Sequence, residues 1–308
     1  MFVGACNGLF FGVNRHTGTV EWRYDIRKDG DQTGFHGRWL LTTDLVIVAT
    51  DGRDEGFVYA FEQASGAVRW KHHVGRPVPS DVIRHGQLIY VLTQDDSLVA
   101  LELATGTVRW RFAPPESPRF GTFVSSPIIA GDQVVMAGRD GAVYALYGDN
   151  GRVAWQHQIG AVTTSPVMAR DLIYVGIVTE GRVIALSVAS GSRVAQARPT
   201  GSLTPYMHPV VTDWGLSIVT GATLELWTAD LSRLLWQVRA PAQLGRSPVV
   251  WNDKLVGGTV RGHLVGYHAT DGQPAPTVQL SGVVTGLVGF DDVLYVGTQE
   301  GTLYAVRP

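Results

Sequence analysis

A tryptophan recurs in this chain with a glycine four residues before it. The segments read TGTVEW, SGAVRW, TGTVRW and NGRVAW, and they follow one another at intervals of about 40–48 residues. Self-similarity at such a period indicates a repeat architecture, in which each unit buries its apolar faces against its neighbours. The repeat therefore constrains the fold before any single residue is interpreted. The pairs are Gly18/Trp22, Gly66/Trp70, Gly106/Trp110 and Gly151/Trp155.

Within one repeat the pattern is that of four short strands. Apolar runs at 122–130, 133–138, 142–147 and 152–159 are separated by turns rich in Gly, Asp and Asn. Alternating apolar residues with such turns are typical of β-hairpins. Since no segment shows a helical period, the repeat predicts an antiparallel four-stranded meander.

The third strand of the meander recurs eight times and sets the number of units. Its copies are 9–13, 58–61, 98–101, 143–146, 183–186, 224–227, 264–267 and 303–306. Repeated four-stranded sheets of this length predict an all-β, eight-bladed β-propeller of antiparallel blades, as one domain over 1–308. The first unit begins at its second strand and the last ends at its third, so we expect both terminal blades to be incomplete.

The fourth strand carries the recurring tryptophan in five units, and Ala195 and Pro276 replace it in two others. A buried indole removes about 150–250 Å² from water, which suits a wedge between blades. The glycine before it permits a left-handed turn. We expect five blade-docking residues, namely Trp22, Trp70, Trp110, Trp155 and Trp236.

Composition excludes several classes of protein. Net charge is −2 with scattered basic residues, which argues against a nucleic-acid partner. No apolar run approaches the ~20 residues of a transmembrane segment. The start, MFVGACNG, lacks the basic and apolar regions of a signal peptide, so the sequence leaves the localisation open. Cys6 is the single cysteine, which rules out an intrachain disulfide and suits a small core residue.

The docking segments resemble the tryptophan-docking motif of quinoproteins. They read AFEQASGAVRW (60–70), ALELATGTVRW (100–110) and ALYGDNGRVAW (145–155). The chain is identified by this motif as a member of the PQQ-like propeller family over its whole length. It is similar to the non-catalytic branch that includes the outer-membrane assembly lipoprotein. The resemblance implies an often exported protein, periplasmic or at the cell surface, with a cytoplasmic location as the other possibility.

The dehydrogenase branch of that family typically holds its quinone beside two adjacent cysteines and a Ca²⁺ ion. This chain has one cysteine and no converging set of oxygen ligands in its repeat pattern. We therefore expect neither PQQ nor Ca²⁺, no metal site and no catalytic residue.

Candidate contact residues come from departures within the repeat at the mouth of the channel. The residue before the recurring proline is a small hydroxyl in five of seven units, whereas Arg38 and His208 break that pattern. Since the scaffold does not require such departures, they are candidates for grafted function, and sequence drift explains them equally well. The candidate ligand or partner contacts are His36, Arg38, Asp81, Tyr206, His208 and Arg246.

Other polar residues have a structural explanation. His72 and His157 share a position with Tyr24 and Phe112 in other repeats, so we interpret it as a packing position. The acidic turn at 51–55 matches no Ca²⁺ loop and predicts a solvated turn. The Pro-rich segment 113–120 suits either a partner-docking loop or a stiff connector.

The leading functional hypothesis is a non-enzymatic interaction or scaffold propeller, a monomer that binds a protein or peptide partner. One alternative is a ligand- or carbohydrate-sensing propeller that uses Tyr206, His208 and Arg246. Another is an enzyme, either a quinone-dependent dehydrogenase or a glycan-active propeller, which needs acidic residues that converge in the channel.

Overall fold

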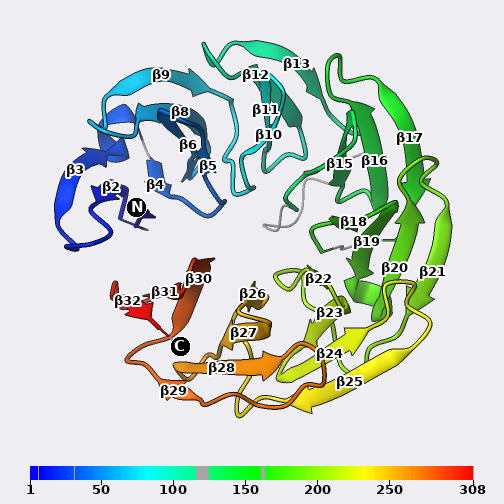
Figure 1. Cartoon of the computed structure of the whole chain (residues 1–308). Coiled ribbons are helices and arrows are strands. Elements are labelled where there is room, and N and C mark those ends of the chain that lie inside the picture. The colour runs from blue at the N-terminus through cyan, green and yellow to red at the C-terminus, as the bar shows by residue number, and fades with distance from the viewer. Residues whose placement is uncertain (6, 31, 116–124, 161–163, 308) are drawn as a thin grey trace. The chain divides into compact units, whose positions relative to one another are not determined.

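The chain divides into two compact units, Met1–Gln158 and Ile159–Pro308, in the computed structural model. The structure describes residues 1–5, 7–30, 32–115, 125–160 and 164–307. Each unit holds four successive sheets of three or four strands, which follow one another in chain order, and the first unit adds a small two-stranded sheet (Figure 1). That the two units make one domain over 1–308 stays a prediction.

The first unit contains one three-stranded and three four-stranded sheets, which we call blades 1 to 4. Blade 1 consists of β1 (Phe2–Gly4), β2 (Leu9–Val13) and β3 (Val20–Asp25). Blade 2 consists of β5 (Leu40–Leu41), β6 (Leu45–Ala49), β8 (Phe57–Glu62) and β9 (Val68–His73). Blade 3 consists of β10 (Ile83–His85), β11 (Leu88–Leu92), β12 (Leu98–Glu102) and β13 (Val108–Phe112). Blade 4 consists of β14 (Ile128–Ala130), β15 (Gln133–Ala137), β16 (Ala142–Tyr147) and β17 (Val153–Gln158).

The second unit contains blades 5 to 8. Blade 5 consists of β18 (Val167–Ala169), β19 (Leu172–Ile177), β20 (Arg182–Ser187) and β21 (Arg193–Ala197). Blade 6 consists of β22 (Val210–Thr212), β23 (Gly215–Thr220), β24 (Thr223–Trp227) and β25 (Leu234–Arg239). Blade 7 consists of β26 (Val249–Trp251), β27 (Lys254–Gly258), β28 (His263–His268) and β29 (Val278–Gln279). Blade 8 consists of β30 (Val284–Phe290), β31 (Val293–Thr298) and β32 (Leu303–Val306).

The incomplete terminal blades are confirmed. Blade 1 lacks a first strand and blade 8 lacks a fourth, so each is three-stranded. All eight copies of the third strand lie where the sequence predicts them. The first strand of blade 4 begins only at Ile128, later than the run from 122 suggests, and 121–124 lie outside the described residues. Cys6 and most of the Pro-rich segment, 116–120, lie outside them as well.

Four short elements among the described residues interrupt the repeat. The pair β4 (Gln32–Gly34) and β7 (Asp51–Gly52) forms a small two-stranded sheet beside blade 2. The 3-10 helix η1 (Ile26–Asp29) begins at Asp25, whose side chain accepts a hydrogen bond from the backbone of Arg27. A second one, η2 (Val178–Glu180), links β19 to β20.

A β-bulge precedes the docking position in blade after blade. In blade 2, Ala60 pairs with Trp70 but Phe61 pairs with Val68, so one residue is extra. The same shift occurs between the third and fourth strands of blades 1, 3, 4, 5 and 6. Because a bulge turns the side chains that follow it, the repeat aims each tryptophan in the same direction.

The core lies between blades and not inside any one of them. β6 is buried along its whole length, whereas the fourth strand β9 is mostly exposed. Each apolar cluster joins residues of two successive blades within a unit; the cluster of blades 2 and 3, for example, includes Ile47, Trp70 and Val91. A blade therefore depends on its neighbours for burial, as the repeat predicts.

Candidate functional site

The recurring tryptophan contacts the next repeat and not its own glycine. The indole Nε1–H of Trp70 in blade 2 donates to the carbonyl oxygen of Leu103 in blade 3 (3.0 Å). Its ring covers Gly106, where a Cβ would overlap the indole. Gly106 also has a φ of +71°, so it supplies both the left-handed turn and the room for the ring.

The same geometry recurs at other blade boundaries. Trp22 donates to Gln63 (2.9 Å), Trp110 to Gly148 (2.7 Å) and Trp236 to Ala269 (3.0 Å). Trp155 lies on β17, half-buried and opposite Ala145. The glycines covered by these rings are Gly66 under Trp22, Gly151 under Trp110 and Gly272 under Trp236. The structure places the two residues of a docking pair in different repeats, whereas the sequence spacing suggests a pair within one repeat.

At the boundary between blades 5 and 6, both members of the docking pair are replaced, the tryptophan on blade 5 and the glycine on blade 6. Ala195 on β21 occupies the tryptophan position, and the turn of blade 6 has Ser232 at the position of the docking glycine, with Leu231 before it in a left-handed conformation (φ +59°). Leu231 is 3% exposed and packs in the same cluster as Ala195. Tyr174 donates its hydroxyl to the carbonyl of Ala229 (2.7 Å), the acceptor that an indole uses elsewhere. Both members of the pair have changed together.

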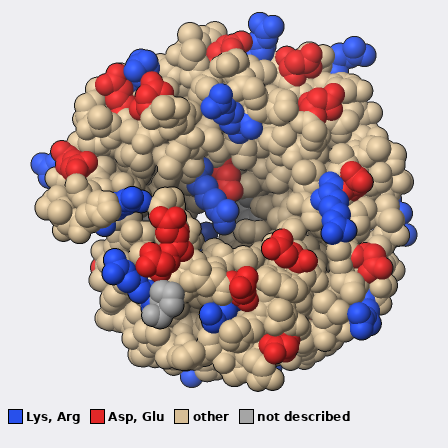
Figure 2. All heavy atoms as spheres, viewed as in Figure 1, with Lys and Arg blue, Asp and Glu red and all other residues tan. Residues whose placement is uncertain are grey.

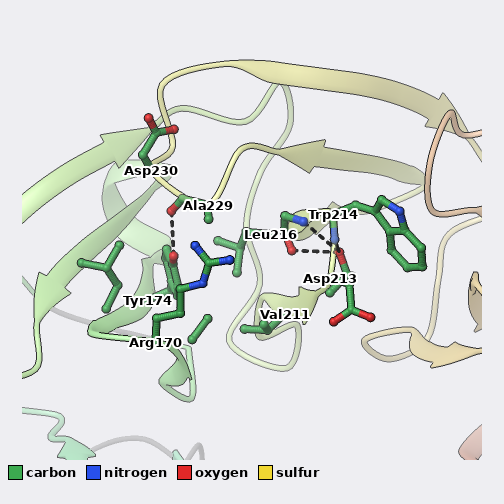
Figure 3. Close-up of a pocket in the computed structure, with 12 residues that line it drawn as sticks. Arg170, Tyr174, Val211, Asp213, Trp214, Leu216, Ala229 and Asp230 are labelled. Atoms are coloured by element: carbon green, nitrogen blue, oxygen red, sulfur yellow. Dashed lines mark hydrogen bonds between the residues drawn. The ribbon is translucent and has the colours of Figure 1, made fainter.

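A cavity of about 370 Å³ lies at this same boundary (Figure 3). Leu172, Val211 and Leu216 contribute apolar walls, and Arg170 extends into it from the turn between β18 and β19. Within the described residues, the Arg170 guanidinium has no hydrogen-bond or ion-pair partner. Hydrogen bonds from Thr228 and Ser232 lower the pKa of Asp230, at the rim, to about 2.

A buried carboxylate faces the same boundary from blade 6. Glu225 on β24 is fully buried, with Oε1 accepting from the backbone N of Thr200 (2.8 Å) and Oε2 from the indole of Trp227 (2.7 Å). These donors satisfy the buried charge and tie the segment after β21 to blade 6. Sequence reasoning missed Glu225, although aligning the third strands would have shown an acid where blade 2 has Tyr59.

In the first unit, the candidate contacts from the sequence fall into two local pairs. The backbone N of Arg38 donates to Asp81 Oδ1 (2.8 Å), and the backbone N of Asp81 donates to Ser126 Oγ (3.0 Å). Nδ1 of His36 pairs with the Asp51 carboxylate. Both His36 and Arg38 are exposed, so their side chains are accessible to a partner.

In the second unit, the remaining candidates lie in the two segments that precede β22 and β26. Tyr206 is 63% exposed and Arg246 is exposed as well. The hydroxyl of Ser247 donates to the carbonyl of His208 (3.0 Å). Ser247 therefore links two successive blades, as Ser126 does in the first unit. The structure brings Arg38 to Asp81; that all six candidates make one site stays a prediction.

The histidines of the fourth strands occupy equivalent positions. His72 pairs with Val58, His157 with Val143 and Phe112 with Leu98, at the same register of each blade. Burial lowers the pKa of His72, and the charges of His73 and Arg111 lower it further. Over the described ranges, no three His, Cys, Asp or Glu side chains are placed to hold a metal ion.

An ionic cluster that sequence reasoning missed joins blades 1 and 2. Asp29 at the end of η1 accepts from Tyr24 (2.8 Å), Tyr59 (3.0 Å) and Lys71 (2.7 Å). Burial acts to raise the pKa of Asp29, but hydrogen bonds from Lys71 and the two tyrosines bring it below its ordinary value. In the acidic turn, Asp54 and Glu55 are exposed, with Glu55 3.7 Å from His73, whereas Asp51 is half-buried and pairs with His36.

The face of the molecule in Figure 2 carries charges of both signs. Acidic and basic side chains are interspersed over the face seen in Figure 2. No helix among the described residues has the length and hydropathy to cross a membrane.

Comparison with known proteins places the chain by sequence and by fold. A family model described as "Outer membrane protein assembly factor BamB" matches residues 7–232 and 179–308. The chain is 23% identical to the protein of that name from Yersinia pestis, over 99% of this chain and 81% of the relative. It is 26% identical to the Salmonella typhimurium protein, over 97% and 80%.

Two solved structures share the fold. The crystal structure of BamB from Moraxella catarrhalis has a TM-score of 0.81 at 15% identity and covers 100% of this chain and 93% of that one. The computationally designed Ika8 protein has a TM-score of 0.81 at 14% identity, with coverage of 100% and 92%. The expected fold class, an all-β eight-bladed propeller with three-stranded terminal blades, is thus confirmed. By its repeats, its sheet topology and its family match over nearly all its length, the chain belongs to the BamB-like family of PQQ-type β-propellers.

Proposed function

We propose that this protein is a non-enzymatic scaffold that binds a protein partner during the assembly of outer-membrane proteins. The observation that carries the proposal is the match of nearly the whole chain to the family described as an outer membrane protein assembly factor. Because the blades pack against one another, they form a rigid support. A contact surface on such a support loses less conformational entropy when it binds a partner.

We propose that partner contacts come from the exposed candidates of each unit. His36 and Arg38 carry polar, accessible side chains in the first unit, and Tyr206 and Arg246 do so in the second. Exposed aromatic and arginine side chains are the residue types that most often dominate the energy of protein interfaces. Asp81 supports Arg38 by accepting from its backbone, and the carbonyl of His208 is held by Ser247.

The scaffold function is tested in the native cell. Deleting the gene should lower the amount of folded outer-membrane β-barrel proteins, measured by their heat-modifiable migration in gels, and the wild-type gene should restore it. Unchanged levels of folded barrels in the deletion strain would contradict the proposal.

The contact residues are tested by complementation of that strain. The double substitution Tyr206→Ala with Arg246→Ala should fail to restore barrel levels while leaving the melting temperature unchanged. The matched control is Tyr147→Ala with Arg152→Ala, which removes an exposed tyrosine and an exposed arginine from blade 4. Equal restoration by the two double variants would reject these contacts.

We further propose that the scaffold acts without PQQ. The chain has one cysteine, so it cannot form the vicinal disulfide on which the dehydrogenase branch typically stacks its quinone. Addition of PQQ with Ca²⁺ should leave the melting temperature and the quinone absorbance unchanged. A saturable rise in melting temperature would overturn this part of the proposal.

A further inference from the structure

Arg170, beside the cavity between blades 5 and 6, has a left-handed backbone conformation. At the equivalent turns of other blades this conformation belongs to glycine, asparagine or aspartate. Arg170 has a φ of +53° in the turn between the first and second strands of its blade. The same turn position is left-handed in blades 3, 4, 7 and 8, where the residues are Gly86, Gly131, Asn252 and Asp291. Glycine, asparagine and aspartate are the residues that tolerate this region best.

The strain at Arg170 thus coincides with a cavity and with a cation that has no hydrogen-bond or ion-pair partner among the residues that the structure describes. Folding gains nothing from a long side chain at this turn, because glycine serves in two equivalent blades. Strained residues that persist beside a cavity point to function when the strain is actually observed. The guanidinium of Arg170 lies between Tyr174 and Leu216, whereas the Asp213 and Asp230 carboxylates point away from it (Figure 3).

The walls of the cavity define the shape of an occupant. Leu172 and Val211 are half-buried and Leu216 is 1% exposed, so apolar surface lies beside the guanidinium. The hydroxyl of Tyr174 is already committed to the carbonyl of Ala229. Since Arg170 is exposed, the site opens to solvent and suits a segment laid across it better than an enclosed small molecule.

We propose that this cavity, the Arg170 site, binds an extended segment of a protein partner that carries one acidic side chain flanked by aliphatic residues two positions away. The carboxylate would accept hydrogen bonds from the planar fork of Arg170. In an extended segment, residues two positions apart share a face, so the aliphatic side chains would lie on Leu172 and Val211. Asp213 at the rim disfavours a second carboxylate.

The inference deepens the proposed scaffold function and rests on it for the assumption of a protein partner. The Arg170 site lies in blades 5 and 6, among strand-end turns that do not include Tyr206, His208 or Arg246.

The test uses the peptide acetyl-Gly-Leu-Ser-Glu-Ser-Leu-Gly-amide and its counterpart with Gln in place of Glu. Binding to the full chain is followed through the backbone amide resonances of Gly215 and Ala229. The Glu peptide should bind at least about tenfold more tightly, as expected for one charge-assisted hydrogen-bond pair. In Arg170→Gly the two peptides should bind equally, while the melting temperature rises by about 2 °C because glycine relieves the turn.

The matched control is Asn252→Gly, the same change at the equivalent turn of blade 7, which should preserve the tenfold preference. Equal affinities in the wild-type chain, no measurable binding, or a preference that survives Arg170→Gly would each overturn the site. If the peptide binds as expected but gene deletion leaves barrel levels unchanged, the site stands and the scaffold function falls. If deletion lowers barrel levels but the peptides bind equally, the scaffold function stands and the site falls.

Discussion

The boundary between blades 2 and 3 and the boundary between blades 5 and 6 solve the same packing problem with different residues. At the first, Trp70 covers Gly106 and donates to the carbonyl of Leu103. At the second, Ala195 faces Leu231, and Tyr174 donates to the equivalent carbonyl, that of Ala229. At the first boundary a large residue covers a small one on the next blade. At the second boundary the residue on the first blade is small and a larger residue of the next blade packs beside it.

The two boundaries also differ in what else they contain. The cluster of blades 2 and 3 is made of apolar side chains buried around Trp70. The boundary of blades 5 and 6 adds the cavity with Arg170 and the buried carboxylate of Glu225. An indole that fills its slot leaves no room for other chemistry. Replacing it frees space in which residues not needed for folding can accumulate, which is where function is grafted onto a repeat scaffold.

The largest effect is expected for Trp70→Ala. Removing the indole leaves a cavity over Gly106 and an unpaired carbonyl at Leu103, so the free energy of unfolding should fall by about 3–5 kcal/mol. Urea denaturation measures it, with Val68→Ala on the same strand as the control, because Val68 is partly exposed (37%). A loss below about 1 kcal/mol would mean that the blades do not depend on the docking residue.

Gly106→Ala should cost about 2–4 kcal/mol. The new Cβ would overlap the ring of Trp70, and the turn requires a φ of +71°. The control is Gly86→Ala, which has a φ of +60° but open space around its Cβ, and should cost only the conformational term of about 1 kcal/mol. Thermal unfolding of both variants separates crowding from backbone strain; equal losses would show that no crowding exists.

Ala195→Trp should destabilise the chain by about 1–3 kcal/mol, since Leu231 already fills the space that an indole would take. Adding Leu231→Gly should make the tryptophan less harmful, because the second change empties the space that the buried Leu231 side chain fills beside Ala195. The measurement is the free energy of unfolding of both single variants and the double variant. Strict additivity would show that Ala195 and Leu231 do not compensate each other.

A small and pH-dependent effect is expected for His72→Phe, which copies Phe112 of the next blade. Burial lowers the folded-state pKa of His72, so below an unfolded-state pKa of about 6.5 the unfolded chain binds the proton first and stability falls. The wild-type chain should therefore lose more stability than the variant between pH 7.5 and 5, by less than about 1 kcal/mol. Parallel urea curves at the two pH values test this; a greater loss in the variant would reverse the sign.

The sequence predicts the blades well because its strongest signal is local. Each third strand keeps an apolar pattern between tight turns, and the positive φ of Gly106 or Gly151 follows from the turn. The missing terminal strands follow from counting the same repeats. Contacts between repeats are harder to predict, because a spacing pattern pairs Gly66 with Trp70 although Gly66 lies under Trp22.

The candidate contacts show the same limit. Arg38 and Asp81 were singled out separately as departures from the repeat, and only the fold shows that one supports the other. The apolar pattern of the strands does not single out Arg170. Its unusual backbone conformation is seen only when the equivalent turns of several blades are compared in the structure. The sequence does not single out Asp29 either, because its partners Tyr59 and Lys71 lie on the next blade.

The most direct test of docking between repeats is a pair of double-mutant cycles on Trp70. One combines Trp70→Ala with Gly106→Ala, and the other combines Trp70→Ala with Gly66→Ala. The account predicts an interaction energy above about 1 kcal/mol in the first cycle, because a ring that is gone cannot clash, and additivity within about 0.5 kcal/mol in the second. Coupling between Trp70 and Gly66, with none to Gly106, would contradict it.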